Sequence, residues 1–302
     1  MVEENLCGVF LMLSNAVLAT ALCATGVVFC GYRKRVKKRK AGQQQQIVEL
    51  QNRITHLSEC PPRGVEVLNC PKSIAQKLVF VSYAQNFEDL ILYDALGDVQ
   101  DVFYIDVGAN LPTYASVTKF FYEKGYHGIN IEPLLKEYGE LARERDRDTN
   151  LCVCAGKKEG ELELYEQGGL STLDIGVAKT WPHIPKPRKV SIVPLSKICE
   201  QYCKLGQEIQ FCKIDVEGFE REVLLGFDFK NFRPKIFVME ATEPCTMIPT
   251  HQKWEDILFD NGYLFAYQCE VNRYYIDGNF PELKDKFIGI EALMDKYVII
   301  KP

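Results

Sequence analysis

From residue 79 to the C-terminus, short apolar runs alternate with amphipathic segments. The apolar runs have the length and the β-branched and aromatic content of strands. They lie at 102–107, 127–132, 151–155, 162–165, 190–193, 209–216, 235–240, 264–268, 274–276 and 297–300. Helical spacing occurs at 115–124, 134–147, 195–202, 219–225 and 254–260. Because most of these strands are apolar on both faces and alternate with helices, the pattern predicts an α/β fold with a mostly parallel sheet.

The N-terminus has a different pattern, because residues 6–32 contain no charged side chain. These 27 residues exceed the roughly 20 that cross a bilayer as a helix, so they predict one transmembrane helix after a short tail, 1–5. A cleaved signal peptide is the main alternative, but it needs a basic segment before the apolar run, where this chain has Glu3 and Glu4. A buried core helix is disfavoured because the run has no polar face.

A basic segment follows, with seven Lys and Arg residues between Arg33 and Lys40. By the positive-inside rule these charges place the C-terminal body in the cytosol, while a lumenal body stays open as the alternative for an enzyme of glycans. Residues 33–78 are interpreted as a basic flank and linker, and 79–302 as one domain. We therefore expect a single-pass protein of the ER or Golgi that contacts the lipid bilayer through residues 6–32.

The rest of the chain is acidic. Residues 41–302 contain 29 basic and 39 acidic side chains, a net charge of −10. Such a body repels phosphate backbones, so no nucleic acid is expected as a partner. A hydrophobic fraction of 47% with 25% charged residues is that of a globular protein, which excludes a disordered chain or a multi-span membrane protein.

Acidic residues follow or end four of the predicted strands, at the sheet edge where α/β proteins bind ligands. They are Asp106, Glu132, Asp215 with Glu217, and Glu240. Glu132 has the position of an acid that holds both hydroxyls of a ribose. The loop after Asp106 has one glycine, Gly108, and Pro112 in place of the glycine repeat that binds a pyrophosphate. The site therefore suits a nucleoside without phosphate, such as S-adenosylmethionine.

Methyl transfer from a sulfonium to a hydroxyl needs a group near the acceptor that takes the proton. Asp215 is the first candidate because it ends the central strand beside the expected methyl group. His251 is the second, since its ordinary pKa suits a base, and Glu240 is the third. Glu217 is expected to contact the substrate. Asp215, Glu217 and Glu240 could also hold a divalent metal, but nothing in the sequence requires one and no metal ligand is assigned.

Segments of the body resemble the FkbM-type methyltransferases. They are 82–89 (SYAQNFED), 104–110 (YIDVGAN), 125–133 (GYHGINIEP), 169–174 (GLSTLD), 211–220 (FCKIDVEGFE), 233–234 (RP), 240–242 (EAT), 250–251 (TH) with 254–255 (WE), and 272–275 (NRYY). Each segment alone is weakly specific, but their order and spacing over residues 82–276 are specific.

The resemblance implies a class I, Rossmann-like methyltransferase fold with a seven-stranded sheet, S-adenosylmethionine as cofactor, and a sugar or related hydroxyl as acceptor. Contacts to the cofactor are implied for Gln85, Asp89, Asp106, Gly108, Asn110 and Glu132. A substrate contact is implied for Asn272 and Arg273, with a scaffold role as the alternative.

The sequence thus predicts a membrane-anchored methyltransferase that acts on a hydroxyl of a glycan or glycolipid. Two alternatives stay open. In the first, the acceptor is a protein side chain or a lipid headgroup. In the second, the chain is a non-catalytic membrane scaffold that keeps the fold.

Overall fold

A computed structural model describes residues 78–97, 99–204 and 206–302. The expected tail (1–5), transmembrane helix (6–32) and nearly all of the linker (33–78) lie outside these residues. These assignments and the domain boundary at 79 therefore stay predictions. Among the described residues, no helix combines the length and the apolar character that a membrane span requires.

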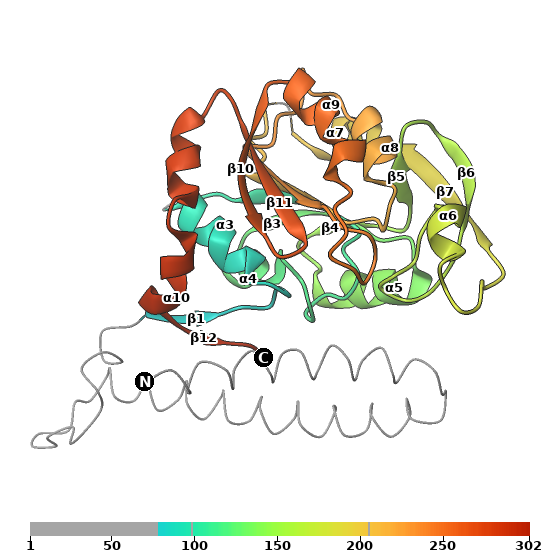
Figure 1. The fold of residues 1–302 in the computed structure, drawn as a ribbon, viewed down its shortest axis with the longest axis horizontal. Helices are drawn as coiled ribbons and strands as arrows, with labels where there is room; N and C mark the ends of the chain where they lie inside the picture. The colour runs from blue at the N-terminus through green and yellow to red at the C-terminus, as the bar shows by residue number, and fades with distance from the viewer. Residues whose placement is uncertain (1–77, 98, 205) are drawn as a thin grey trace, which may run out of the picture. The chain divides into compact units, whose positions relative to one another are not determined.

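The body is built on a seven-stranded sheet with the order β10-β11-β9-β8-β2-β3-β4 (Figure 1). The strands are β2 (Phe103–Val107), β3 (His127–Ile131), β4 (Thr149–Leu151), β8 (Phe211–Ile214), β9 (Ile236–Glu240), β10 (Tyr263–Cys269) and β11 (Asn272–Asp277). The five neighbouring strands from β4 to β9 pair in parallel, whereas β11 runs antiparallel to both β9 and β10. The sheet is mixed but mostly parallel, and the prediction of an α/β fold is confirmed.

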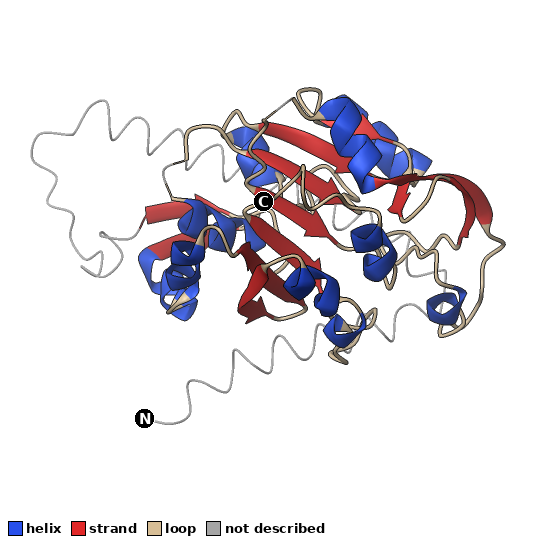
Figure 2. Cartoon of the chain, turned by 90° about the horizontal axis from the view of Figure 1, so that it is seen from above, coloured by secondary structure: helices blue, strands red, loops and turns tan. Residues whose placement is uncertain are grey.

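Helices pack on both faces of this sheet (Figure 2). They include α3 (Glu88–Leu96), α4 (Lys119–Glu123), α5 (Leu135–Glu144), α7 (Leu195–Tyr202), α8 (Glu220–Leu225) and α9 (Glu255–Asp260). Successive residues of a strand enter different cores, because side chains alternate across a sheet. On β2, Ile105 packs in one core with α7, α8 and α9, and Tyr104 packs in the other with α3 and α4. Burial on both faces explains why β2 is apolar along most of its length.

Two smaller sheets complete the described part. β1 (Leu78–Val81) pairs in parallel with β12 (Tyr297–Ile300), and β5 (Cys154–Gly156), β7 (Arg188–Pro194) and β6 (Gly160–Leu164) form a three-stranded sheet. The short helix α6 (Ile175–Ala178) lies in the connection from β6 to β7. The remaining elements are η1 (His251–Lys253), η2 (Pro281–Phe287), η3 (Ile290–Ala292) and α10 (Leu293–Lys296).

Two predicted elements differ from the structure. The strand expected at 151–155 is two strands, since β4 ends at Leu151 in the main sheet and β5 begins at Cys154 in the three-stranded one. The helix expected at 115–124 begins only at Lys119. Ala115 has a φ of +56°, a left-handed conformation that an α-helix does not accept.

Candidate active site

The loop that follows β2 is pressed against the end of β8. Gly108 has a φ of +79°, and a Cβ at this position would lie 1.8 Å from the carbonyl oxygen of Asp215, so only glycine fits. The amides of Gly108 and Ala109 both donate to the carbonyl of Ile131, at 2.9 and 3.1 Å. The predicted cofactor loop is therefore fixed to the ends of β3 and β8 by its backbone.

Glu132, directly after β3, is buried beside this loop. Its Oε2 accepts a hydrogen bond from the amide of Asn110 at 2.7 Å, and its Oε1 accepts one from the amide of Leu134 at 2.8 Å. Burial raises the pKa of Glu132 to about 7, against the lowering effect of these two hydrogen bonds. Each carboxylate oxygen offers two lone pairs, so both can accept a further hydrogen bond from a ligand hydroxyl.

Lys213 connects the ends of β2 and β8. Its Nζ lies 3.6 Å from Asp106 Oδ1 and 3.2 Å from Asp215 Oδ2, and it donates to the carbonyl of Gly108 at 3.2 Å. Burial lowers the pKa of Lys213, but the charges of the two carboxylates outweigh this effect and raise the pKa above its ordinary value. The buried Asp106 also accepts a hydrogen bond from Thr118 at 3.0 Å. Lys213 is thus an ammonium shared by two predicted site residues.

Three predicted site residues meet at the ends of β8 and β9. Carboxylate oxygens of Asp215, Glu217 and Glu240 lie within 4.8 Å of one another, and these residues form what we call the carboxylate cluster. Burial raises the pKa of Glu217 to about 8, with further increases from the charges of Asp215 and Glu220. Burial, then the charges of Asp215 and Glu217, raise the pKa of Glu240 well above its ordinary value.

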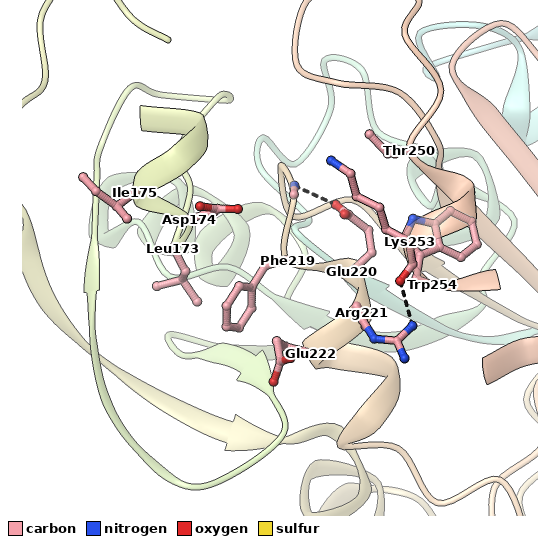
Figure 3. A pocket seen from close by; sticks show the side chains of 11 residues that line it. Leu173, Asp174, Ile175, Phe219, Glu220, Arg221, Glu222, Thr250, Lys253 and Trp254 are labelled. Carbon is pink, nitrogen blue, oxygen red and sulfur yellow. Dashed lines mark hydrogen bonds between the residues drawn. The ribbon is translucent and has the colours of Figure 1, made fainter. Parts of the chain in front are cut away.

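A cavity of about 380 Å³ begins at Gly218, the residue after Glu217. Its walls come from 173–175, 218–222, Thr250 and 253–254. Figure 3 shows Leu173, Asp174 and Ile175 on one side, Thr250, Lys253 and Trp254 on the other, and the start of α8 between them. The volume is that of a small-molecule site, and the walls offer charged, hydroxyl and aromatic groups.

Two residues with an expected cofactor contact lie near the start of α3. Gln85 precedes this helix, and Asp89 is its second residue. Asp89 is buried and accepts hydrogen bonds from Ser82 Oγ and from the amide of Tyr83, both at 2.7 Å. Burial raises the pKa of Asp89 to about 6. The side chain of Gln85 is exposed. Asp89 thus shapes this segment, and a contact of either residue with the cofactor stays a prediction.

The other predicted residues lie on β11 and η1. Asn272, opposite Glu240 in the register of β9 and β11, donates to Glu88 Oε1 at 2.7 Å. His251 Nε2 and Arg273 Nη2 face the carboxylate of Glu255, at 3.8 and 3.5 Å. Burial, then the charge of Arg273, lowers the pKa of His251 and favours the neutral imidazole. Their roles as base or substrate contacts stay predictions.

Arg145, which the sequence did not single out, supports the cofactor loop. It is fully buried, lies 2.8 Å from Asp148 Oδ2, and donates to the carbonyl of Pro112 at 3.2 Å and to Thr118 Oγ1 at 3.1 Å. Thr118 in turn donates to Asp106. Arg145 therefore fixes the far end of the loop. The charged pattern around it resembles a surface helix, so the sequence offers no signal for its burial.

The mostly parallel sheet, with acids at its strand ends that form a candidate ligand site, is an α/β fold compatible with a methyltransferase domain. A comparison with protein families matches residues 106–265 to the methyltransferase FkbM domain. This match covers more than half of the chain, so the chain belongs to the FkbM methyltransferase family, and the resemblance found in the sequence is confirmed. A comparison with curated proteins found no similar sequence.

Proposed function

We propose that the protein is an S-adenosylmethionine-dependent O-methyltransferase. The observation that carries the proposal is the position of Glu132 and the carboxylate cluster on either side of the Gly108 loop. One side offers acceptors for a ribose, and the other offers groups for the acceptor hydroxyl. Membership of the family supports methyl transfer as the reaction.

The residues present fit this cofactor. Glycine at position 108 lets the loop pack directly on the carbonyl of Asp215, and this contact fixes the backbone against which the cofactor is proposed to lie. Glu132 keeps acceptor capacity on both oxygens. Asp106 Oδ1 is buried and lies 3.6 Å from Lys213 Nζ, but it has no hydrogen-bond partner among the described residues. These acceptors suit the hydroxyls and the ammonium of the cofactor, and no glycine repeat for a pyrophosphate competes with this interpretation.

S-adenosylmethionine supplies an electrophilic methyl group on its sulfonium. The chain positions the reactants: Glu132 orients a ribose, and Lys213 fixes the loop to the end of β8. Asp215 is the proposed base, because its side chain is 33% exposed and lies at the end of the central parallel strands. Since Lys213 lies nearest Oδ2, the other oxygen, Oδ1, is left to take the proton of the acceptor hydroxyl.

We propose a sugar hydroxyl of a glycan or glycolipid as the acceptor. Asp174 and Lys253 in the cavity can hydrogen-bond to hydroxyls, and the half-buried Phe219 offers apolar surface for the face of a sugar ring. The uncharged residues 6–32 support a membrane anchor, and the basic residues after it support a body on the cytosolic side of an endomembrane, with the lumenal side as the alternative.

Full-length protein in detergent, incubated with deuterated-methyl S-adenosylmethionine and membrane extracts, tests the proposal. We expect label in the glycan or glycolipid fraction. Asp215→Asn should lower turnover by about 100-fold or more with unchanged cofactor affinity. Asp256→Asn, at an exposed acid paired with Arg221, is the control and should keep full activity. Label in the protein or lipid-headgroup fraction would show that the acceptor is a protein side chain or a headgroup in place of a glycan. Cofactor binding without label in any fraction would favour a non-catalytic scaffold.

A further inference from the structure

The carboxylate cluster places three acidic groups beside Lys213, and one ammonium cannot balance all three in their ionised form. The oxygens of Asp215, Glu217 and Glu240 lie within 4.8 Å of one another. Lys213 is shared, at 3.2 Å from Asp215 and 3.6 Å from Asp106, and thus faces a second carboxylate outside the cluster. Like charges at this spacing take up protons or a cation.

A second observation at the same place points to a ligand. Glu217 is 7% exposed, and its Oε2 is buried without a hydrogen-bond partner among the described residues. A buried acceptor of this kind is costly and calls for a partner. Glu220 gives the contrast, since it is equally buried but accepts a hydrogen bond from the amide of Gly218 at 3.0 Å. The carboxylate of Glu217 instead faces Asp215 and Glu240.

The backbone holds Glu217 in this orientation. Its φ is +54°, in the left-handed region that glutamate rarely adopts. Its carbonyl accepts a hydrogen bond from Thr172 Oγ1 at 2.7 Å, which connects it to the segment before α6. The direction of the Glu217 side chain is therefore set by the loop as well as by its own rotamer.

We infer that Asp215, Glu217 and Glu240 together bind one divalent cation, Mg²⁺ or Mn²⁺. The three donors are all carboxylates, the ligands that these hard cations prefer. For Mg–O bonds of about 2.1 Å, ligand oxygens lie about 3 Å apart when adjacent and about 4 Å apart when opposite. Oxygens already within 4.8 Å need only small rotations of the side chains to reach these values.

The chemical role of this cation rests on the proposed function and refines its substrate class. With the cation bound, Asp215 would act as a ligand instead of as the base. The cation would coordinate the acceptor oxygen and lower the pKa of its hydroxyl, whose proton leaves to water. The acceptor oxygen then forms a bond to the methyl carbon while the carbon–sulfur bond breaks. The electron pair of the broken bond stays on sulfur. An acceptor with two neighbouring oxygens, such as a vicinal diol, is favoured because both can bind the same ion.

Mn²⁺ binding to the full-length protein, without nucleoside or acceptor, tests the site. Electron paramagnetic resonance measures the loss of the free-ion signal, and we expect one ion per chain that excess Mg²⁺ displaces. Glu217→Gln and Glu240→Gln should each weaken binding by at least about tenfold, since even the loss of outer-shell partners of a metal costs 10- to 100-fold. Asp174→Asn removes an acid from the wall of the adjacent cavity and should leave the affinity unchanged.

Thermal unfolding of the two glutamine variants shows whether Glu217 and Glu240 are metal ligands or only support the fold. Removing one of several repelling carboxylates should leave the Tm of the metal-free protein unchanged or higher, and the rise caused by Mn²⁺ should disappear. No Mn²⁺ binding by the wild-type protein, or an affinity equal to that of the wild type in both glutamine variants, would overturn the site. Calorimetry with S-adenosylmethionine on the same sample tests the proposed function separately. If the protein binds Mn²⁺ but not S-adenosylmethionine, the proposed enzymatic function is refuted and the metal site is retained.

Discussion

Replacing Gly108 by alanine tests the close approach of the cofactor loop to β8. Two costs add in this variant. An L-residue at a φ of +79° costs about 1–2 kcal/mol. The new Cβ would also lie 1.8 Å from the carbonyl oxygen of Asp215, and a forced shift of this kind costs about 1–3 kcal/mol more. We therefore expect a loss of about 2–5 kcal/mol, or roughly 4–20 °C in Tm at 2–4 °C per kcal/mol.

Gly289→Ala is the matched control. Gly289 has a φ of +72°, and a Cβ there would meet no heavy atom within 4 Å, so this variant carries the conformational cost alone. Its Tm should fall by roughly 2–8 °C, and its affinity for S-adenosylmethionine should not change. Gly108→Ala should in addition lose at least about tenfold in affinity, since each 1.4 kcal/mol is a factor of ten. Equal effects of the two variants in differential scanning fluorimetry and calorimetry would refute the steric argument.

Two further variants test the supports of the loop. Burial raises the pKa of Glu132 from 4.5 to about 7, so this group stabilises the fold less as pH rises from about 4.5 to 7, by about 3 kcal/mol in total. Asp89 and Glu217, whose pKa values are also raised, add to the fall with pH in the wild type and in Glu132→Gln alike. Urea unfolding at a series of pH values should therefore show a fall that is about 3 kcal/mol smaller in Glu132→Gln than in the wild type, and parallel curves would contradict the assignment. Arg145→Met leaves Asp148 buried without its cation and should cost about 3–5 kcal/mol, whereas Arg143→Met, at an exposed side chain, should change stability by less than about 0.5 kcal/mol. Similar melting curves for both would count against the buried pair.

The local hydrophobic pattern predicts where helices and strands form in this chain better than it predicts which strands pair. The helix at 195–202 and the strand at 297–300 form where the sequence places them, but that strand pairs with β1 rather than in the main sheet. The split of 151–155 between two sheets was missed because one short apolar run carries no signal of where the chain turns. Partner choice depends on contacts distant in sequence, which periodicity does not contain.

The residues of the candidate site could likewise be predicted from the sequence better than their contacts. Asp215, Glu217 and Glu240 were predicted as acids at strand ends, and a parallel sheet brings such positions together by its geometry. Lys213 received no role, although a lysine inside the mostly apolar strand at 209–216 is an unusual charge that could have drawn attention to it. The contact of Asn272 with Glu88 joins residues 184 positions apart, and no sequence pattern encodes it.

A crystal structure of the protein with S-adenosylhomocysteine tests the central claim most directly. The account predicts the nucleoside against the backbone of residues 108–110, with both ribose hydroxyls within hydrogen-bond distance of Glu132. A crevice without nucleoside density, or one that binds a pyrophosphate compound in its place, would contradict the account.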